Sequence, residues 1–476
     1  METATQALHR LTSYEPGREW TVPIDDPRVI QDLEVNDLAR LPWFFKRYGQ
    51  PLARTPLPRD LPATAAPAVA VLAGTANVAP AELDLPLLSR LLHLSAGVVR
   101  STERPYGVHP FRAAGSAGGR FPLELYVAVP EGTALPAGVH WYDAERHELV
   151  QVGPTPRGEA PTVVVTGVPW RTGWRYRERG YRHVYWDAGT MLSQMLAAAD
   201  SGGQPPRLYT RFSDAEVARL VGADGVHEWP VAVVALSDGD AALAATGPAA
   251  EGAVDSAPLE FPLVTAAQRA GELETLGGPW DPGTAVAVCV DSAEPVEAVV
   301  LTRGSQRLMD PARGVSNRLL LTSMAVSMRG IDVPHFVAVH DVEDVPPGLY
   351  RWPELTAPVR EGDLRDVLYR LSLEQGLARD AAFVAIAATD VSTLDDREYR
   401  EVELAAGLVE GRLHLAAYAL GASASGMTFV DSEMPGLLGE PPDTLLLTCV
   451  GVPEYASLPG GPPGEPTSIR MVTARL

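Results

Sequence analysis

One pattern of residues occurs twice in this chain. The pattern R-x-Y-R-x-V-x-x-x-A-G begins at Arg179 and recurs from Arg397. A repeat spaced by about two hundred residues is too long for a solenoid and predicts two fused copies of one domain. In such a chain, a site that a homodimer builds twice at its interface can be kept once and lost once.

The length of 476 residues fits two domains rather than one. With 46% hydrophobic and 21% charged residues, the composition is that of a globular protein. We expect an N-terminal arm and linker at 1–80, a first domain at 81–250, a connecting region at 251–281 and a second domain at 282–476.

Periodicity of the apolar residues predicts the elements of each copy. In the first copy we expect helices at 85–94, 182–199 and 214–221, strands at 121–129, 161–168 and 230–236, and a hairpin at 138–149. In the second copy we expect strands at 284–290, 298–302, 337–342, 383–389 and 445–452, and helices at 317–328 and 401–420. This order predicts an α+β fold, with mostly antiparallel sheets flanked by helices.

Charge and composition exclude several classes of function. The net charge of -21 argues against a nucleic-acid partner, which needs a basic stripe. No apolar run is long enough for a membrane span, and residues 1–10 do not have the pattern of a signal peptide, so we expect a cytoplasmic protein. Cys289 and Cys449 lie in short apolar runs and predict buried, inert thiols, with no metal site.

The N-terminal region is rich in proline and charge and contains the aromatic cluster Trp43, Phe44 and Phe45. It predicts an extended arm with a short helix, which either covers apolar surface or grips a partner through the aromatic cluster. Residues 62–80 are rich in alanine and proline and predict a linker or weak loop.

A short basic segment follows the strand expected at 298–302. Arg303, Ser305 and Arg307 alternate along it, so in an extended conformation they point to one side and can grip a phosphate. The alternative is a solvated basic face. The first copy has no such Arg-x-Ser-x-Arg pattern around 85–99.

The first copy instead has a turn of small residues, from Gly115 to Gly119, that leads into a strand. Such a turn lets backbone amides approach a flat ligand closely. The aligned segment of the second copy, 322–334, lacks these glycines. Each half therefore keeps one part of a single composite site.

Three segments of the first copy resemble the SagB/McbC-type dehydrogenases of the nitroreductase superfamily. They are the Ser-Ala-Gly-Gly-Arg-Phe-Pro-Leu-Glu-Leu-Tyr stretch at 116–126, the hairpin at 136–143 and the Tyr-Arg-His-Val-Tyr-Trp-Asp-Ala-Gly stretch at 181–189. The resemblance implies tandem nitroreductase-like domains in a pseudo-dimer with one FMN. It also implies oxidation of azolines to azoles in ribosomally made peptides, and the proline-rich arm is similar to that of members from thiopeptide pathways.

The resemblance also implies roles for individual residues. Phosphate ligands would be Arg303, Ser305 and Arg307, with Arg470 as a further one. Ser116, Ala117 and Arg120 would flank the ribityl chain and the ring, and Ser425, Gly426 and Met427 would lie near N5.

Azoline oxidation needs a base beside the flavin. Family members carry a Lys-Tyr pair where this chain has Arg175 and Tyr176, and the only lysine is Lys46. An arginine cannot act as the base, but it can lower the pKa of a neighbouring tyrosine. Tyr176 is therefore the candidate base. The alternatives are that Tyr176 is a packing aromatic, or that His183 takes this role.

The function that these features predict is an FMN-dependent azoline dehydrogenase that acts on a precursor peptide. Oxygen would reoxidise the flavin, and cyclodehydratase components would be partners. Two alternatives remain open: a flavin oxidoreductase for another amide-like substrate, and a flavin-free scaffold subunit of a peptide-modifying complex.

Overall fold

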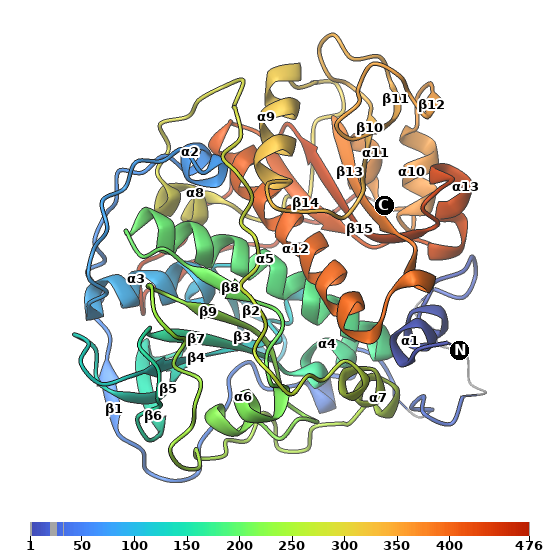
Figure 1. Cartoon of the computed structure of the whole chain (residues 1–476). Coiled ribbons are helices and arrows are strands. Elements are labelled where there is room, and N and C mark those ends of the chain that lie inside the picture. The colour runs from blue at the N-terminus through green and yellow to red at the C-terminus, as the bar shows by residue number, and fades with distance from the viewer. Residues whose placement is uncertain (1, 20–25, 32, 476) are drawn as a thin grey trace.

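The two halves of the chain contain sheets of matching strand order (Figure 1). The computed structural model describes residues 2–19, 26–31 and 33–475. The first sheet has the order β1-β6-β5-β4-β7-β9-β8 and the second the order β12-β11-β10-β13-β15-β14, with antiparallel neighbours in both. The strands of the first sheet are β1 (Arg54–Pro56), β4 (Leu123–Val129), β5 (Gly138–Asp143), β6 (Glu148–Gly153), β7 (Thr162–Gly167), β8 (Arg207–Tyr209) and β9 (Trp229–Ala235). Those of the second are β10 (His335–Val339), β11 (Gly348–Arg351), β12 (Arg360–Glu361), β13 (Phe383–Thr389), β14 (Ser423–Met427) and β15 (Asp443–Gly451).

Helices flank the two sheets, so the predicted α+β class with duplicated, mostly antiparallel sheets is confirmed. The long helices α5 (Gly180–Ser201) and α12 (Asp396–Ala419) pack against each other at the centre of the molecule (Figure 1). The others are α1 (Ala4–Leu11), α2 (Ala68–Ala73), α3 (Leu85–Ala96), α4 (Pro169–Tyr176), α6 (Asp214–Val221), α7 (Pro262–Ala270), α8 (Val296–Thr302), α9 (Asn317–Ser327), α10 (Arg365–Leu371), α11 (Gly376–Asp380) and α13 (Met434–Leu438).

The repeated glycine of the sequence pattern lies where α5 and α12 cross. A Cβ added to Gly189 would collide with the backbone carbonyl of Leu404, and one added to Gly407 would collide with that of Trp186. The pattern keeps glycine in both copies because each helix backbone rests directly on the other.

The repeated arginines join the two halves. Asp431 accepts a hydrogen bond of 2.7 Å from each arginine of the first repeat. Asp214 in turn pairs with both arginines of the second repeat, at 2.8 and 2.9 Å. Although burial opposes the shift, the arginines hold the pKa of Asp431 at about 2. Each copy of the pattern thus reaches an aspartate of the opposite half.

The N-terminal arm packs on both halves of the molecule, and the segment near the C-terminus packs on the first half. The arm forms α1, which lies against α7 and α12, and β1, which extends the first sheet. Near the C-terminus, β16 (Thr467–Ser468) pairs in parallel with β2 (Val98–Arg104) of the first half, and β3 (Gly107–Arg112) completes a small third sheet.

The start of each repeat differs from the sequence-based expectation. The strand predicted at 298–302 is helix α8, and 284–290 has no regular structure, so Cys289 is exposed while Cys449 is buried. The predicted linker at 62–80 contains α2, a buried helix. A short apolar run fits a strand and a buried helix equally well, which is why periodicity misassigned 298–302. The linker was predicted from its alanine and proline content, which does not exclude a short helix.

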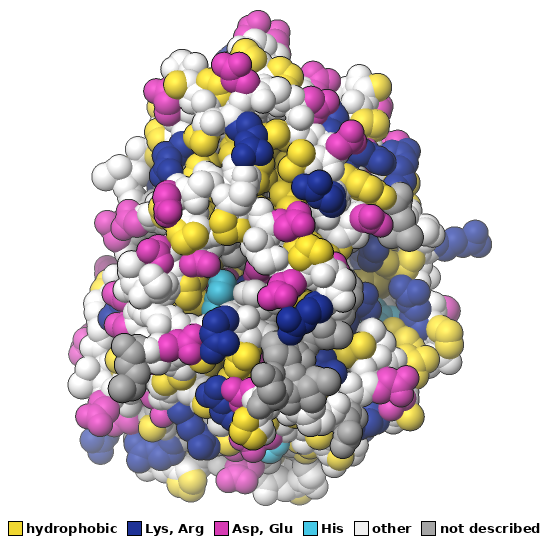
Figure 2. All heavy atoms as spheres, turned by 90° about the vertical axis from the view of Figure 1, so that its right-hand side faces the viewer, with side chains coloured by type: hydrophobic (Ala, Val, Ile, Leu, Met, Phe, Trp, Pro, Cys, Tyr) yellow, Lys and Arg dark blue, Asp and Glu magenta, His cyan; other side chains and the backbone are white. Residues whose placement is uncertain are grey.

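Charges of both signs are interspersed on the face that carries α1 and α13, as Figure 2 shows. Among the described residues, none of the helices combines the length and apolar character needed to cross a membrane. The same part of the chain holds no cluster of three or more His, Cys, Asp or Glu side chains arranged for a metal ion.

Candidate active site

Arg303 of the second half lies against the glycine turn of the first half. It follows the end of α8, is 3% exposed, and donates from Nη2 to the Ala113 carbonyl at 2.7 Å. A Cβ added to Gly115 would lie 3.3 Å from Arg303 Nη1 and 3.5 Å from Ser305 Oγ. The two segments that the sequence assigned to one composite site are therefore in contact.

The Arg303 guanidinium has unused hydrogen-bonding capacity. Its Nε and Nη1 are buried, and neither has a partner in the structure. Burial, together with nearby Arg100, lowers the pKa of Arg303 to about 10. Burying a cation with two unpaired donors costs free energy unless an anion binds to them. This position is therefore suited to a phosphate group.

The other predicted phosphate ligands are not buried. Ser305, Arg307 and Arg470 are exposed, and the Arg307 amide donates to Tyr455 Oη at 3.2 Å. In the described part of the chain, neither Arg307 nor Arg470 forms an ion pair. The segment follows helix α8 and not the expected strand, and within it Arg303 is buried whereas Ser305 and Arg307 are exposed.

The turn after Gly115 is held by Asp187 of α5. Ser116 Oγ donates to Asp187 Oδ2 at 2.5 Å, and the Ala117 amide donates to Oδ1 at 3.0 Å. Burial raises the pKa of Asp187 to about 8, with the Glu410 charge adding to the shift and the bonds from the turn opposing it. Asp187 thus fixes the backbone that would face a flat ligand.

Tyr176 and Arg175 lie directly over this turn. Gly118 has a φ of +60°, and a Cβ there would be 2.7 Å from Tyr176 Oη and 2.6 Å from Arg175 Cδ. The turn therefore needs glycine both for its backbone and for its close approach. The Tyr176 ring packs on His183, with centroids 4.0 Å apart, and both ring nitrogens of His183 are buried without a partner.

The protonation of Tyr176 differs from the expectation. Burial raises the pKa of Tyr176, and Arg175 offsets this only in part, so the hydroxyl keeps its proton at neutral pH. Lys46, the single lysine, is buried and held by Glu228 at 2.5 Å and by Tyr126 at 2.8 Å. It therefore has a structural role in the first sheet.

Strand β14 contributes the remaining predicted residues, Ser425, Gly426 and Met427, of which the first and last are buried. A side chain at Gly426 would collide with the carboxylate of Glu410 on α12. The same carboxylate accepts a hydrogen bond from Thr190 of α5 at 3.1 Å. Both long helices thus reach the site.

Arg120 extends away from the glycine turn toward the arm. Its guanidinium lies 5.2 Å from the Phe44 ring centroid and 4.7 Å from that of Trp174. It is 3% exposed, and burial lowers its pKa to about 10. The aromatic cluster of the arm therefore packs beside the candidate site, with Phe44 half-buried.

Comparisons with known proteins identify relatives in sequence and in fold. No protein-family model matches the chain. A candidate nitroreductase of Methanocaldococcus jannaschii is 28% identical over 164 residues, which span 31% of this chain and 78% of that protein. The crystal structure of a candidate nitroreductase from Anabaena variabilis ATCC 29413 covers 95% of this chain and 100% of its own, with 23% identity and a TM-score of 0.71.

The chain has a nitroreductase-like fold. The likeness to the Anabaena structure extends over both halves, so the duplicated architecture is part of this nitroreductase-like fold. An FMN-dependent nitroreductase from Clostridium difficile R20291 also matches 34% of this chain and 89% of its own, at 15% identity and a TM-score of 0.25.

Prediction from the sequence missed two acidic residues that lie among the predicted site residues. Asp187 contacts the glycine turn, and Glu410 lies beside Arg303 and β14. Asp187 lies in the segment 181–189, one of the three that resemble SagB/McbC-type dehydrogenases. An acidic residue in a helix expected to be buried was the sequence feature that could have identified it. For Glu410 the signal was similar: an acid on the largely buried helix α12.

Proposed function

We propose that this protein is an FMN-dependent oxidoreductase that oxidises azoline rings to azoles in a ribosomally made peptide. The observation that carries the flavin part is the buried Arg303 guanidinium, with two unpartnered nitrogens beside the glycine turn of the other half. The azoline part is supported by the three segments that resemble SagB/McbC-type dehydrogenases. Peptide and cyclodehydratase partners follow from the same resemblance.

The residues present fit a flavin mononucleotide. Arg303 and Ser305 would hold the phosphate, with Arg307 and Arg470 at the exposed rim. Ser116, Ala117 and Arg120 belong to the turn that would lie along the ribityl chain and ring, while Ser425, Gly426 and Met427 would approach the ring from β14. When bound, FMN supplies a hydride acceptor.

The chain itself would position the substrate and move one proton. Azoline oxidation removes a proton from Cα and a hydride from Cβ, and we assign the proton to Tyr176 Oη. Since burial raises the pKa of Tyr176, only a small fraction is phenolate at neutral pH, and Arg175 increases this fraction. Asp187 keeps the turn beneath Tyr176 in place through Ser116 and Ala117.

The test is the visible spectrum and the flavin content of the purified protein, followed by incubation with an azoline-bearing peptide. We expect one FMN per chain and a loss of about two mass units per ring. A protein without flavin even after soaking with FMN would favour the scaffold alternative. A flavoprotein that leaves the azoline unchanged would favour an oxidoreductase for another amide-like substrate, and two FMN per chain would contradict the composite site.

A further inference from the structure

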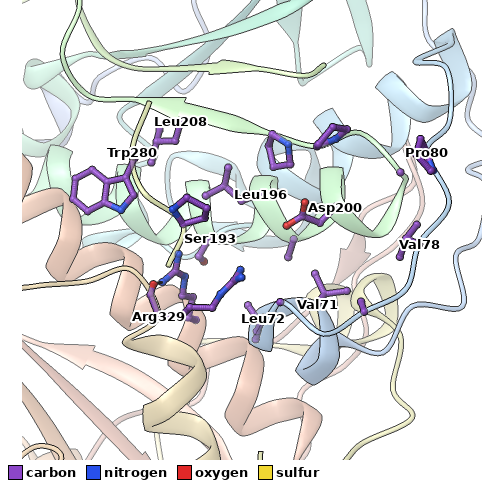
Figure 3. Close-up of a pocket in the computed structure, with 18 residues that line it drawn as sticks. Val71, Leu72, Val78, Pro80, Ser193, Leu196, Asp200, Leu208, Trp280 and Arg329 are labelled. Atoms are coloured by element: carbon purple, nitrogen blue, oxygen red, sulfur yellow. Dashed lines mark hydrogen bonds between the residues drawn. The ribbon is translucent and has the colours of Figure 1, made fainter. Parts of the chain in front are cut away.

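A cavity occupies the position that the internal repeat relates to the candidate flavin site. It has a volume of about 440 Å³ and lies between α2, α5, the turn before β8 and three side chains from later in the chain, Trp280 of the connecting region and Arg329 and Arg412 of the second half (Figure 3). The candidate flavin site lies in the same way between α8, α12, β14 and the first half. Here α2 takes the place of α8, and α5 the place of α12.

The sequence supports this correspondence. Both α2 and α8 follow a proline, Pro67 or Pro295, at the helix cap. The segment after α2 reads Thr-Ala-Asn-Val-Ala, from Thr75 to Ala79, where the segment after α8 reads Arg-Gly-Ser-Gln-Arg. The helix at the wall of the cavity is therefore equivalent in the two positions, but the residues proposed to hold a phosphate are absent after α2.

In their place the cavity contains two guanidinium groups and one carboxylate. Arg412 of α12 is 6% exposed and is fixed by donating from Nη1 to the Arg329 carbonyl at 2.6 Å. The Arg329 side chain lies over Gly74, and its Nε is buried without a partner. Figure 3 shows Arg329 and Asp200 projecting into the cavity from opposite sides. Among the described residues, Asp200 forms no ion pair within 4.0 Å.

Burial has shifted the pKa of all three groups, and it lowers the pKa of Arg329. It lowers the pKa of Arg412 to about 10, with Arg329 adding to the shift, and it raises the pKa of Asp200 to about 6. Two cations and one anion leave one positive charge unbalanced in a largely apolar cavity. An added anion that reaches Arg329 and Arg412 would neutralise that charge.

The rest of the wall is apolar and includes one large aromatic ring. It is formed by Val71, Leu72, Val78, Pro205, Pro206, Leu196, Leu208 and Trp280. Trp280 is held in place because its Nε1 donates to the Gly330 carbonyl at 3.0 Å. Cavities of this kind, with apolar walls and a few convergent polar groups, are typical of small-molecule sites.

We propose that this cavity binds an organic monoanion, with a carboxylate on Arg329 and Arg412 and an apolar or aromatic body against Trp280 and the aliphatic wall. The site is distinct from the candidate flavin site and does not depend on the proposed function. It lacks the Arg-x-Ser-x-Arg segment, so it does not take FMN.

Benzoate is the probe, with benzyl alcohol as its neutral analogue. Binding to the full-length, FMN-treated protein is measured by calorimetry and by the change in its intrinsic tryptophan fluorescence, with Trp280→Phe as the variant that should lose this change. We expect one benzoate per chain and at least about tenfold weaker binding of benzyl alcohol. Arg329→Gln should weaken benzoate binding by about tenfold or more. Val78→Trp, in a half-buried loop position, should abolish it by filling the cavity.

Arg318→Gln, on the exposed side of α9, is the matched control and should bind benzoate as the parent does. Benzoate binding that is absent at millimolar concentration, or unchanged in both Arg329→Gln and Val78→Trp, would overturn the proposal. Equal affinity for benzyl alcohol, or a second FMN that competes with benzoate, would also overturn it. Thermal melting of each variant separates loss of the site from loss of the fold.

Discussion

The internal repeat relates two positions, the candidate flavin site and the cavity beside Trp280, and their residues have diverged. The contacts that join the two halves have not diverged. At one position a buried arginine, Arg303, faces a glycine turn, and at the other Arg329 and Arg412 face Asp200 across a cavity. The paired arginines of each repeat still bind one aspartate of the opposite half, Asp431 or Asp214. Each half needs the interface contacts to remain folded against the other, while the one flavin per chain that we propose would leave the second position free to change.

The largest effect is expected from breaking the interface contacts. Asp431→Ala and Asp214→Ala each leave two buried arginines without their carboxylate, which costs about 3–5 kcal/mol. We expect a similar fall in the free energy of unfolding for both, measured by urea denaturation. A large fall for one variant and a negligible fall for the other would show that the two contacts are not equivalent.

Tyr176→Phe tests the proposed proton acceptor. The ring remains, so flavin binding and folding should be retained, while azoline turnover falls by about 10²-fold or more. Since the pKa of Tyr176 is raised, turnover of the parent should increase with pH above neutrality. Near-parental turnover of Tyr176→Phe, with His183→Gln inactive, would move the role to His183.

Arg303→Ala and Arg329→Ala compare the two positions directly. Loss of a charge-assisted contact to phosphate should weaken FMN binding by about 10- to 100-fold in Arg303→Ala. Arg329→Ala should bind FMN as the parent does, and the exposed Arg307→Ala should show a smaller loss than Arg303→Ala. Fluorescence titration with FMN measures all three. Equal losses in Arg303→Ala and Arg329→Ala would contradict the assignment of the flavin to one position.

A further prediction concerns pH. The pKa of Asp187 is about 8 in the folded protein and about 4 when unfolded, so its contribution to stability is full below pH 4 and is lost as the pH rises through 8. The melting temperature of Asp187→Asn should therefore change less between pH 5 and 9 than that of the parent. Asp332→Asn, an exposed position, serves as the control and should follow the parent.

Long periodic segments were predictable, and short apolar runs at the start of each repeat were not. The helix expected at 214–221 is α6, and the strand expected at 383–389 is β13, with the same bounds. The strand expected at 298–302 is α8, because a run of four apolar residues fits either structure and packing on α5 and α12 decided between them. The alanine- and proline-rich composition of 62–80 hid α2, and with it the counterpart of the Arg303 segment.

The sequence alone determined that the chain is duplicated and that its two halves retain different residues. The repeated pattern is visible because it is local, and the glycine turn at 115–119 and the segment from Arg303 are recognisable by composition. Only the tertiary structure decided which residues meet: Arg303 with Gly115, Asp187 with Ser116, and each arginine pair with an aspartate of the other half. These partners are far apart along the chain, and periodicity carries no information about contacts that folding alone creates.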